Sequence, residues 1–132
     1  MTEEPSKAVV IDNGSGWCKA GVAGDETPAC CFPTVISEDP TGESKVLVGR
    51  AALENRHKNP IFRPVERGRY LDWNALEQIW QHCFIEQLRV DSTEHPVLST
   101  FYPDENKQDK ENMTMIFFEA FSVPGYYSMS SS

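Results

Sequence analysis

A carboxylate, a small-residue turn and a lysine follow one another at Asp12, Gly14-Ser15-Gly16 and Lys19. Glycines let the backbone approach a ligand closely, and their amide groups can point together toward an anion. The Ser15 hydroxyl adds a donor, and Lys19 adds a positive charge. Asp12 would hold a hydrated Mg²⁺ that bridges to a phosphate, because hard cations prefer carboxylate oxygen and keep several waters. The pattern therefore predicts a loop that binds the phosphates of a magnesium complex.

The same turn has a second interpretation that the residues alone leave open. Asn-Gly at positions 13 and 14 is a strong signal for a β-hairpin, so "NGSG" taken by itself favours a simple hairpin turn. The segment is neither a Walker loop nor the Gly-x-Gly-x-x-Gly loop of dinucleotide-binding folds. The mechanisms of those two loops therefore do not apply.

Composition and charge exclude several classes of protein. The net charge of −8 argues against a nucleic-acid partner, because neutralising phosphates needs clustered Lys and Arg. The N-terminus lacks a basic segment followed by an apolar run, and no apolar stretch approaches the length that spans a bilayer, so we expect no signal peptide and no membrane partner. The four cysteines lack zinc-ligand spacing. We expect them to be buried, reduced thiols in a cytoplasmic protein of one domain, residues 1–132.

Three short strands are predicted around the turn. Residues 8–12 form a β-branched run, residues 17–24 continue after the turn, and residues 29–36 read as a third strand. Together they predict a three-stranded β-meander with the Gly-Ser-Gly turn at its first corner.

Residues 37–68 are predicted to form an irregular outer arm. Residues 51–57 are compatible with one or two helical turns. Pro60 and Pro64 are then expected to prevent regular structure until Gly68.

Residues 72–88 carry the best helix pattern, with Asp72 as a plausible N-cap. His82 falls off the apolar stripe and is expected to face solvent. The stripe recurs at three- and four-residue steps and consists of Leu76, Ile79, Trp80, Cys83, Phe84 and Leu88.

A strand at 95–100, a second amphipathic helix at 106–121 and a strand near 126–130 predict a βαβ unit. Its two strands should be parallel, next to one another or one strand apart. The predicted fold class is therefore α/β, with a mixed sheet made of a meander plus a βαβ unit and two main helices. Residues 1–36 and 69–132 would form the core.

Several longer stretches, in order along the chain, resemble actin and the actin-related proteins. "DNGSGWCKAGVAGDETPACCFPTVI" is similar to the opening of that family, and "RPVERGRYLDWNALEQIWQHCFIEQLRV" to the segment that enters its first large helix. "EHPVLST" and "NMTMIFFEAFSVPGYY" resemble the strand and helix that follow. The resemblance implies a partial actin-like (ribonuclease H-like) domain, truncated to the N-terminal part of the first lobe.

The resemblance also implies roles for the residues of the turn. In the family, the amides and the serine hydroxyl at the positions of Ser15, Gly16 and Trp17 hold the β- and γ-phosphates of the nucleotide, in a loop that includes Gly14 here. Lys19 would lie along the phosphates, and Asp12 would sit near the water shell of the metal. The implied cofactor is Mg-ATP or Mg-ADP, with weak or no binding by this chain alone.

Three departures from the family pattern limit what carries over. Arg67 stands where conventional actin has a modifiable histidine, so that modification is impossible here. The loop at 37–45 is shorter than the segment that contacts the next subunit in a filament, so we expect weak or absent polymerisation. Ser131 aligns near the catalytic glutamine, and the second phosphate loop and adenine pocket are missing from the 132 residues. We therefore expect no ATP hydrolysis.

The resulting expectation is an actin-like structural or interaction protein of the cytoplasmic cytoskeleton. Its partners would be actin, actin-related subunits or a larger cytoskeletal assembly. Two alternatives stay open: an ATP-binding actin-related protein that completes its cleft by self-association or with a partner, and a truncated product without an independent role.

Overall fold

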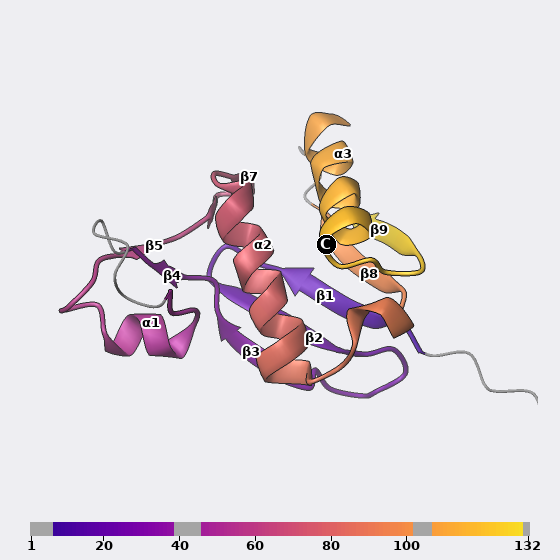
Figure 1. Ribbon diagram of the computed structural model, residues 1–132, viewed down its shortest axis with the longest axis horizontal. Helices are drawn as coiled ribbons and strands as arrows, with labels where there is room; N and C mark the ends of the chain where they lie inside the picture. Colours follow the sequence, from indigo (N-terminus) through magenta and orange to yellow (C-terminus); the bar gives the residue numbers. More distant parts are fainter. Residues whose placement is uncertain (1–6, 39–45, 102–106, 131–132) are drawn as a thin grey trace, which may run out of the picture.

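The computed structural model describes residues 7–38, 46–101 and 107–130. A five-stranded sheet of order β3-β2-β1-β8-β9 forms its centre, and the main helices lie on one face of that sheet (Figure 1). The predicted fold class is confirmed, because a three-stranded meander continues into a βαβ unit. Most of the expected loop at 37–45, and the expectation at Ser131, lie outside the described residues.

The meander consists of β1 (Val9–Asn13), β2 (Trp17–Val22) and β3 (Cys30–Pro33), paired antiparallel. Side chains alternate between the two faces of a strand, so Val9 and Ile11 of β1 enter the core. The third strand ends earlier than predicted.

The outer arm contains more regular structure than the prolines led us to predict. Strand β4 (Ile36–Ser37) pairs with β5 (Ile61–Phe62), and β6 (Val65–Glu66) pairs with β7 (Arg69–Tyr70). The expectation of irregular backbone up to Gly68 is therefore wrong. Each proline immediately precedes a strand, where its missing N–H interrupts no ladder. The helical turn of the arm is α1 (Arg50–Glu54).

The helix predicted at 72–88 is present as α2 (Trp73–His82), which continues in π-helical geometry as η1 (Cys83–Leu88). Asp72 is the N-cap, as predicted, and accepts a hydrogen bond from the Ala75 amide at 3.0 Å. The placement of His82 in solvent is wrong. Its ring is half-buried and meets Phe32 edge to face, with ring centroids 5.1 Å apart.

The βαβ unit begins with β8 (Val97–Phe101), which follows the short 3₁₀ helix η2 (Ser92–Glu94). Helix α3 (Lys107–Met115), with its π-helical end η3 (Ile116–Ala120), crosses to β9 (Tyr126–Ser130). Strands β8 and β9 are parallel and adjacent, and β8 is also parallel to β1. The parallel βαβ unit is therefore confirmed.

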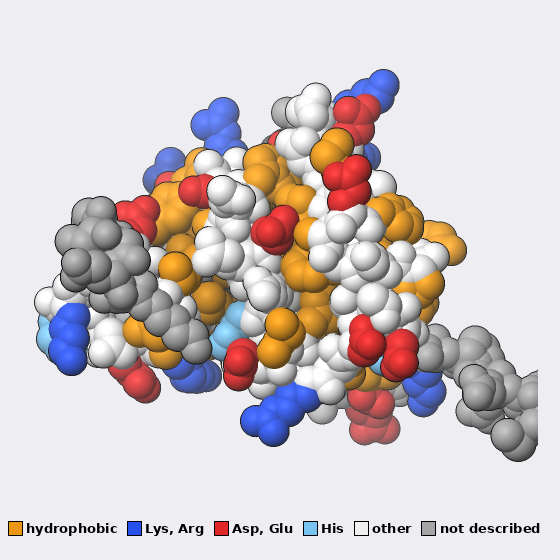
Figure 2. Space-filling model, in the orientation of Figure 1, with side chains coloured by type: hydrophobic (Ala, Val, Ile, Leu, Met, Phe, Trp, Pro, Cys, Tyr) orange, Lys and Arg blue, Asp and Glu red, His pale blue; other side chains and the backbone are white. Residues whose placement is uncertain are grey.

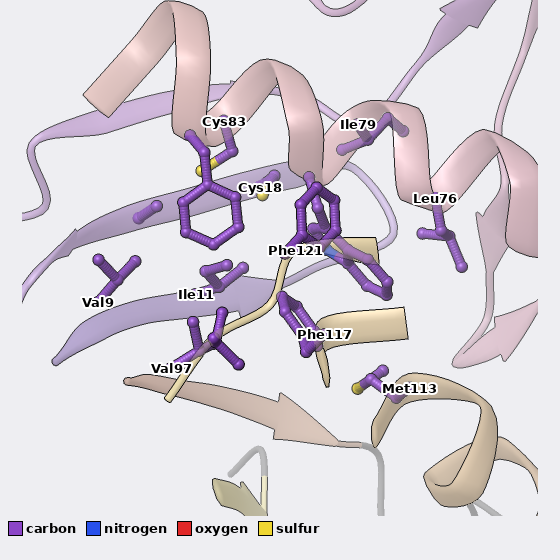
Figure 3. Packing of buried hydrophobic residues seen from close by; sticks show 14 of the residues in the cluster. Val9, Ile11, Cys18, Leu76, Ile79, Cys83, Val97, Met113, Phe117 and Phe121 are labelled. Carbon is purple, nitrogen blue, oxygen red and sulfur yellow. The ribbon is translucent and has the colours of Figure 1, made fainter. Parts of the chain in front are cut away.

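The core lies between the sheet and the two helices (Figure 3). Cys83 of η1 lies next to Cys18 of β2, Ile79 and Leu76 follow along α2, and Phe117 lies between α2 and β8. Its ring centroid is 4.7 Å from that of Trp80, so both helices cover the same face of the sheet.

The cysteines divide between the core and the surface. Cys18 and Cys83 are buried, and Cys30 is half-buried. Cys31 is exposed, so the expectation of buried thiols is wrong for this residue. All four are free thiols, as expected. The hydrogen bond with Cys83 and burial raise the pKa of Cys30, and the hydrogen bond with Cys18 and burial raise the pKa of Cys83.

Within the described ranges, none of the helices has the length and apolar character needed to cross a membrane.

Candidate functional site

The turn between β1 and β2 is built around one obligatory glycine. The Gly14 amide donates to the Trp17 carbonyl at 3.0 Å. A Cβ on Gly14 would lie 2.6 Å from that same carbonyl oxygen, so only glycine fits there. Gly16 differs, because a Cβ added there meets nothing within 4 Å. The described chain leaves the space around Gly16 open.

Thr34 holds the turn from its carbonyl side. Its amide donates to the Gly16 carbonyl at 3.0 Å, and its hydroxyl donates to the Gly14 carbonyl at 3.0 Å. Within 7–38, 46–101 and 107–130, the amides of Ser15 and Gly16 donate to no other residue. The turn therefore carries two available N–H donors on a backbone whose carbonyls are tied down.

Thr100, near the carboxyl end of β8, holds the turn from the neighbouring strand. Its Oγ1 accepts from the Asn13 amide at 2.9 Å and donates to Asp12 Oδ1 at 3.2 Å. Trp80 of α2 adds a buried hydrogen bond, because its Nε1 donates to Asn13 Oδ1 at 2.8 Å. These bonds connect the end of β1 to both β8 and the helix layer.

Asp12 and Lys19 lie directly opposite one another in the β1–β2 register, with both side chains exposed on the sheet face away from the helices. They line a cavity of about 240 Å³ beside the turn that joins β2 to β3. No group of three or more His, Cys, Asp or Glu residues that could hold a metal occurs in the described part of the chain.

The predicted site residues line two separate cavities, with Asp12 and Lys19 at the first. Ser15 and Gly16 line a second cavity, of about 540 Å³, together with the β6–β7 hairpin. Trp17 reaches neither cavity with its ring. That ring is 47% exposed and lies under the Arg50 guanidinium, 5.6 Å from the ring centroid. Only its backbone is placed to serve the turn.

The sequence interpretation missed the residues that support the turn. Thr100 had one usable signal, since it is a polar residue at the carboxyl end of a predicted strand of the βαβ unit, the end where open α/β sheets bind ligands. The arginines of the second cavity also had a signal: "RPVERGR" holds three of them within seven residues of an acidic chain. Thr34 and the Trp80 indole had none, because contacts distant in sequence fix their roles.

A comparison with protein-family models adds independent information. The model described as Actin matches residues 3–132, nearly the whole of the chain.

Proposed function

The chain belongs to the actin family, and we propose that it is an actin-like structural or interaction protein whose β1–β2 turn contacts nucleotide phosphates without catalysing hydrolysis. The observation that carries the phosphate contact is the pair of available amides at Ser15 and Gly16. Three residues before Ser15 stands a carboxylate, Asp12, which accepts a hydrogen bond from Thr100.

These residues fit the phosphate end of a magnesium nucleotide. The space at Gly16 is open, so a phosphate oxygen can approach the backbone closely. Ser15, Gly16 and Trp17 would hold the phosphates through their amides, Lys19 would supply positive charge, and Asp12 would contact the water shell of Mg²⁺. When bound, the magnesium nucleotide would supply a charged group between this edge of the sheet and any protein that contacts the rest of the nucleotide.

The groups of this turn are not sufficient for ATP hydrolysis. It needs an oriented water and charge stabilisation around the transferring phosphate. One turn with one carboxylate supplies neither in full. We therefore expect the 132-residue polypeptide to bind Mg-ATP or Mg-ADP weakly and to release no phosphate from ATP.

The exposed apolar side chains of β9 support an interaction role. Tyr127 is 66% exposed and Met129 is 42% exposed, on the strand face opposite to Tyr126, whose ring stacks on Phe117 in the core. Exposed apolar groups on one sheet face suit contact with another protein. The partners we propose are actin, actin-related subunits or a larger cytoskeletal assembly in the cytoplasm.

Thermal unfolding with and without Mg-ATP tests the phosphate contact. A ligand at ten times its Kd stabilises the folded state by about 1.4 kcal/mol, which raises the Tm of a domain of this size by about 3–5 °C. Asp12→Asn should remove the part of this shift that depends on Mg²⁺, whereas Glu54→Gln, an exposed charge on α1, should leave it unchanged. No shift at millimolar Mg-ATP, or equal loss in both variants, would contradict the proposal.

A phosphate-release assay on the same samples tests the second half of the proposal. Release indistinguishable from a blank is the expected result, and steady turnover that Asp12→Asn abolishes would show that the chain is an enzyme.

A further inference from the structure

Three arginines surround the cavity into which the turn opens. Arg63, Arg67 and Arg69 line the same 540 Å³ cavity as Ser15 and Gly16. Figure 2 shows basic side chains projecting from the end of the molecule where β7 lies. The remaining lining residues are Val65, Glu66 and Leu71.

The positive charge of this cavity is not neutralised from within. Three guanidinium groups face one carboxylate, that of Glu66, in a chain whose net charge is −8. Glu66 stands opposite Arg69 in the hairpin register, yet no acidic group of the described residues lies within 4.0 Å of any of the three guanidinium groups. The cluster therefore concentrates positive charge on an otherwise acidic molecule.

The β6–β7 hairpin places Arg67 at its tip, beside the cavity. Arg67 and Gly68 form the two-residue loop of the β6–β7 hairpin, with φ of 49° and 76°. Positive φ at both positions is the signature of a type I′ turn, which favours Asn-Gly. Arginine is disfavoured in this conformation, so Asn at position 67 should suit the turn better.

We propose that Arg63, Arg67 and Arg69, with the amides of Ser15 and Gly16, form a binding site for a polyphosphate, an anion of two or three linked phosphate groups. Each guanidinium can bind phosphate oxygens in pairs, and the three together carry more positive charge than a single phosphate group neutralises, which favours an anion of linked phosphates. The site needs neither a nucleobase nor Mg²⁺. It goes beyond the proposed nucleotide contact, with which it shares only the two amides.

Isothermal titration of the purified chain with inorganic tripolyphosphate, without Mg²⁺ and at low ionic strength, tests the site. The double variant Arg63→Gln/Arg69→Gln should weaken binding by about a hundredfold, since each of the two charge-assisted contacts contributes about tenfold. Arg89→Gln is the matched control, because Arg89 follows the far end of α2 and η1, about 24 Å along the helix from Trp73. It should change the Kd less than twofold. No binding, or equal weakening in the control, would overturn the proposal.

The variant Arg67→Asn distinguishes loss of binding from loss of folding. Asn-Gly suits the turn better, so this variant should melt about 2–4 °C higher while binding tripolyphosphate more weakly. A variant that is more stable and binds as tightly as the parent would remove Arg67 from the site.

Two further titrations separate this site from the proposed nucleotide contact. ATP without Mg²⁺ should compete with tripolyphosphate, and adenosine should not, because the site recognises the phosphate chain. Lys19→Gln should leave binding of tripolyphosphate intact, because Lys19 lines the other cavity. If that variant abolishes it, the anion lies beside Lys19 and the arginine site is refuted, whatever the response to Mg-ATP.

Discussion

His82 is a residue whose protonation the fold opposes. Its half-buried ring packs against Phe32, and Gln87 lies within hydrogen-bond distance of its Nε2, at 3.0 Å. Burial lowers the pKa of His82, and the nearby Glu86 carboxylate only partly offsets that effect. The folded protein therefore favours the neutral imidazole.

This lowered pKa predicts a specific loss of stability in acid. The unfolded chain takes up the proton near pH 6.5, before the folded protein does. The free energy of unfolding should therefore fall as the pH drops through that value, and His82 should contribute no further change once the pH is below its lowered folded pKa. Urea unfolding from pH 8 to pH 5.5 measures this slope. His82→Gln should flatten it, and identical slopes for parent and variant would contradict the assignment.

At the scale of elements, helix α2 shows how a local signal fixes a boundary. Asp72 has extended backbone, and its carboxylate accepts from the Ala75 amide at 3.0 Å, which satisfies an amide that has no partner inside the helix. Four core residues follow on α2 itself: Ala75, Leu76, Ile79 and Trp80.

Asp72→Ala should lower the free energy of unfolding by about 1 kcal/mol, the usual effect of losing an N-cap side chain. Asp72→Ser should restore most of it, since serine can make the same bond. Denaturant titration of the three proteins measures the difference. A serine variant as unstable as the alanine variant would show that the carboxylate acts through something other than capping.

The elements that the sequence predicted correctly are those with a local pattern. The start of α2 and the parallel βαβ unit follow from patterns within a dozen or so residues, so they were predictable. The strand after Pro60 was missed because its partner, β4, lies far earlier in the chain. The β6–β7 hairpin after Pro64 is local, but its loop, Arg67-Gly68, lacks the Asn-Gly signal of such a turn. The turn was predictable as a motif at Gly14-Ser15-Gly16. The sequence could not predict that the residues around this turn line two separate cavities. The β6–β7 hairpin, which lines one of them, comes from a distant part of the chain.

At the scale of the whole molecule, Phe117 joins the parts of the fold. Its ring contacts Trp80 of α2, Phe121 after η3 and Tyr126 of β9, with centroids 4.7, 5.8 and 4.9 Å away. It is completely buried, whereas the neighbouring Phe118 is 44% exposed.

The two adjacent phenylalanines therefore provide a matched test. Phe117→Ala should lower the free energy of unfolding by about 3–5 kcal/mol, a large share of the about 5–15 kcal/mol typical of a domain. Phe118→Ala should change it by about 0.5 kcal/mol or less. Equilibrium unfolding followed by circular dichroism distinguishes the two, and similar losses would mean that the helix layer is packed differently.

The buried hydrogen bond from Trp80 to Asn13 gives the turn an optical reporter inside the protein. Because the indole N–H is bonded to the residue that precedes Gly14, a change in the backbone there alters the polar surroundings of a ring otherwise enclosed by apolar groups. The emission of Trp80 should therefore register motion of the turn. Anything that loosens the helix layer should disturb the turn through the same bond.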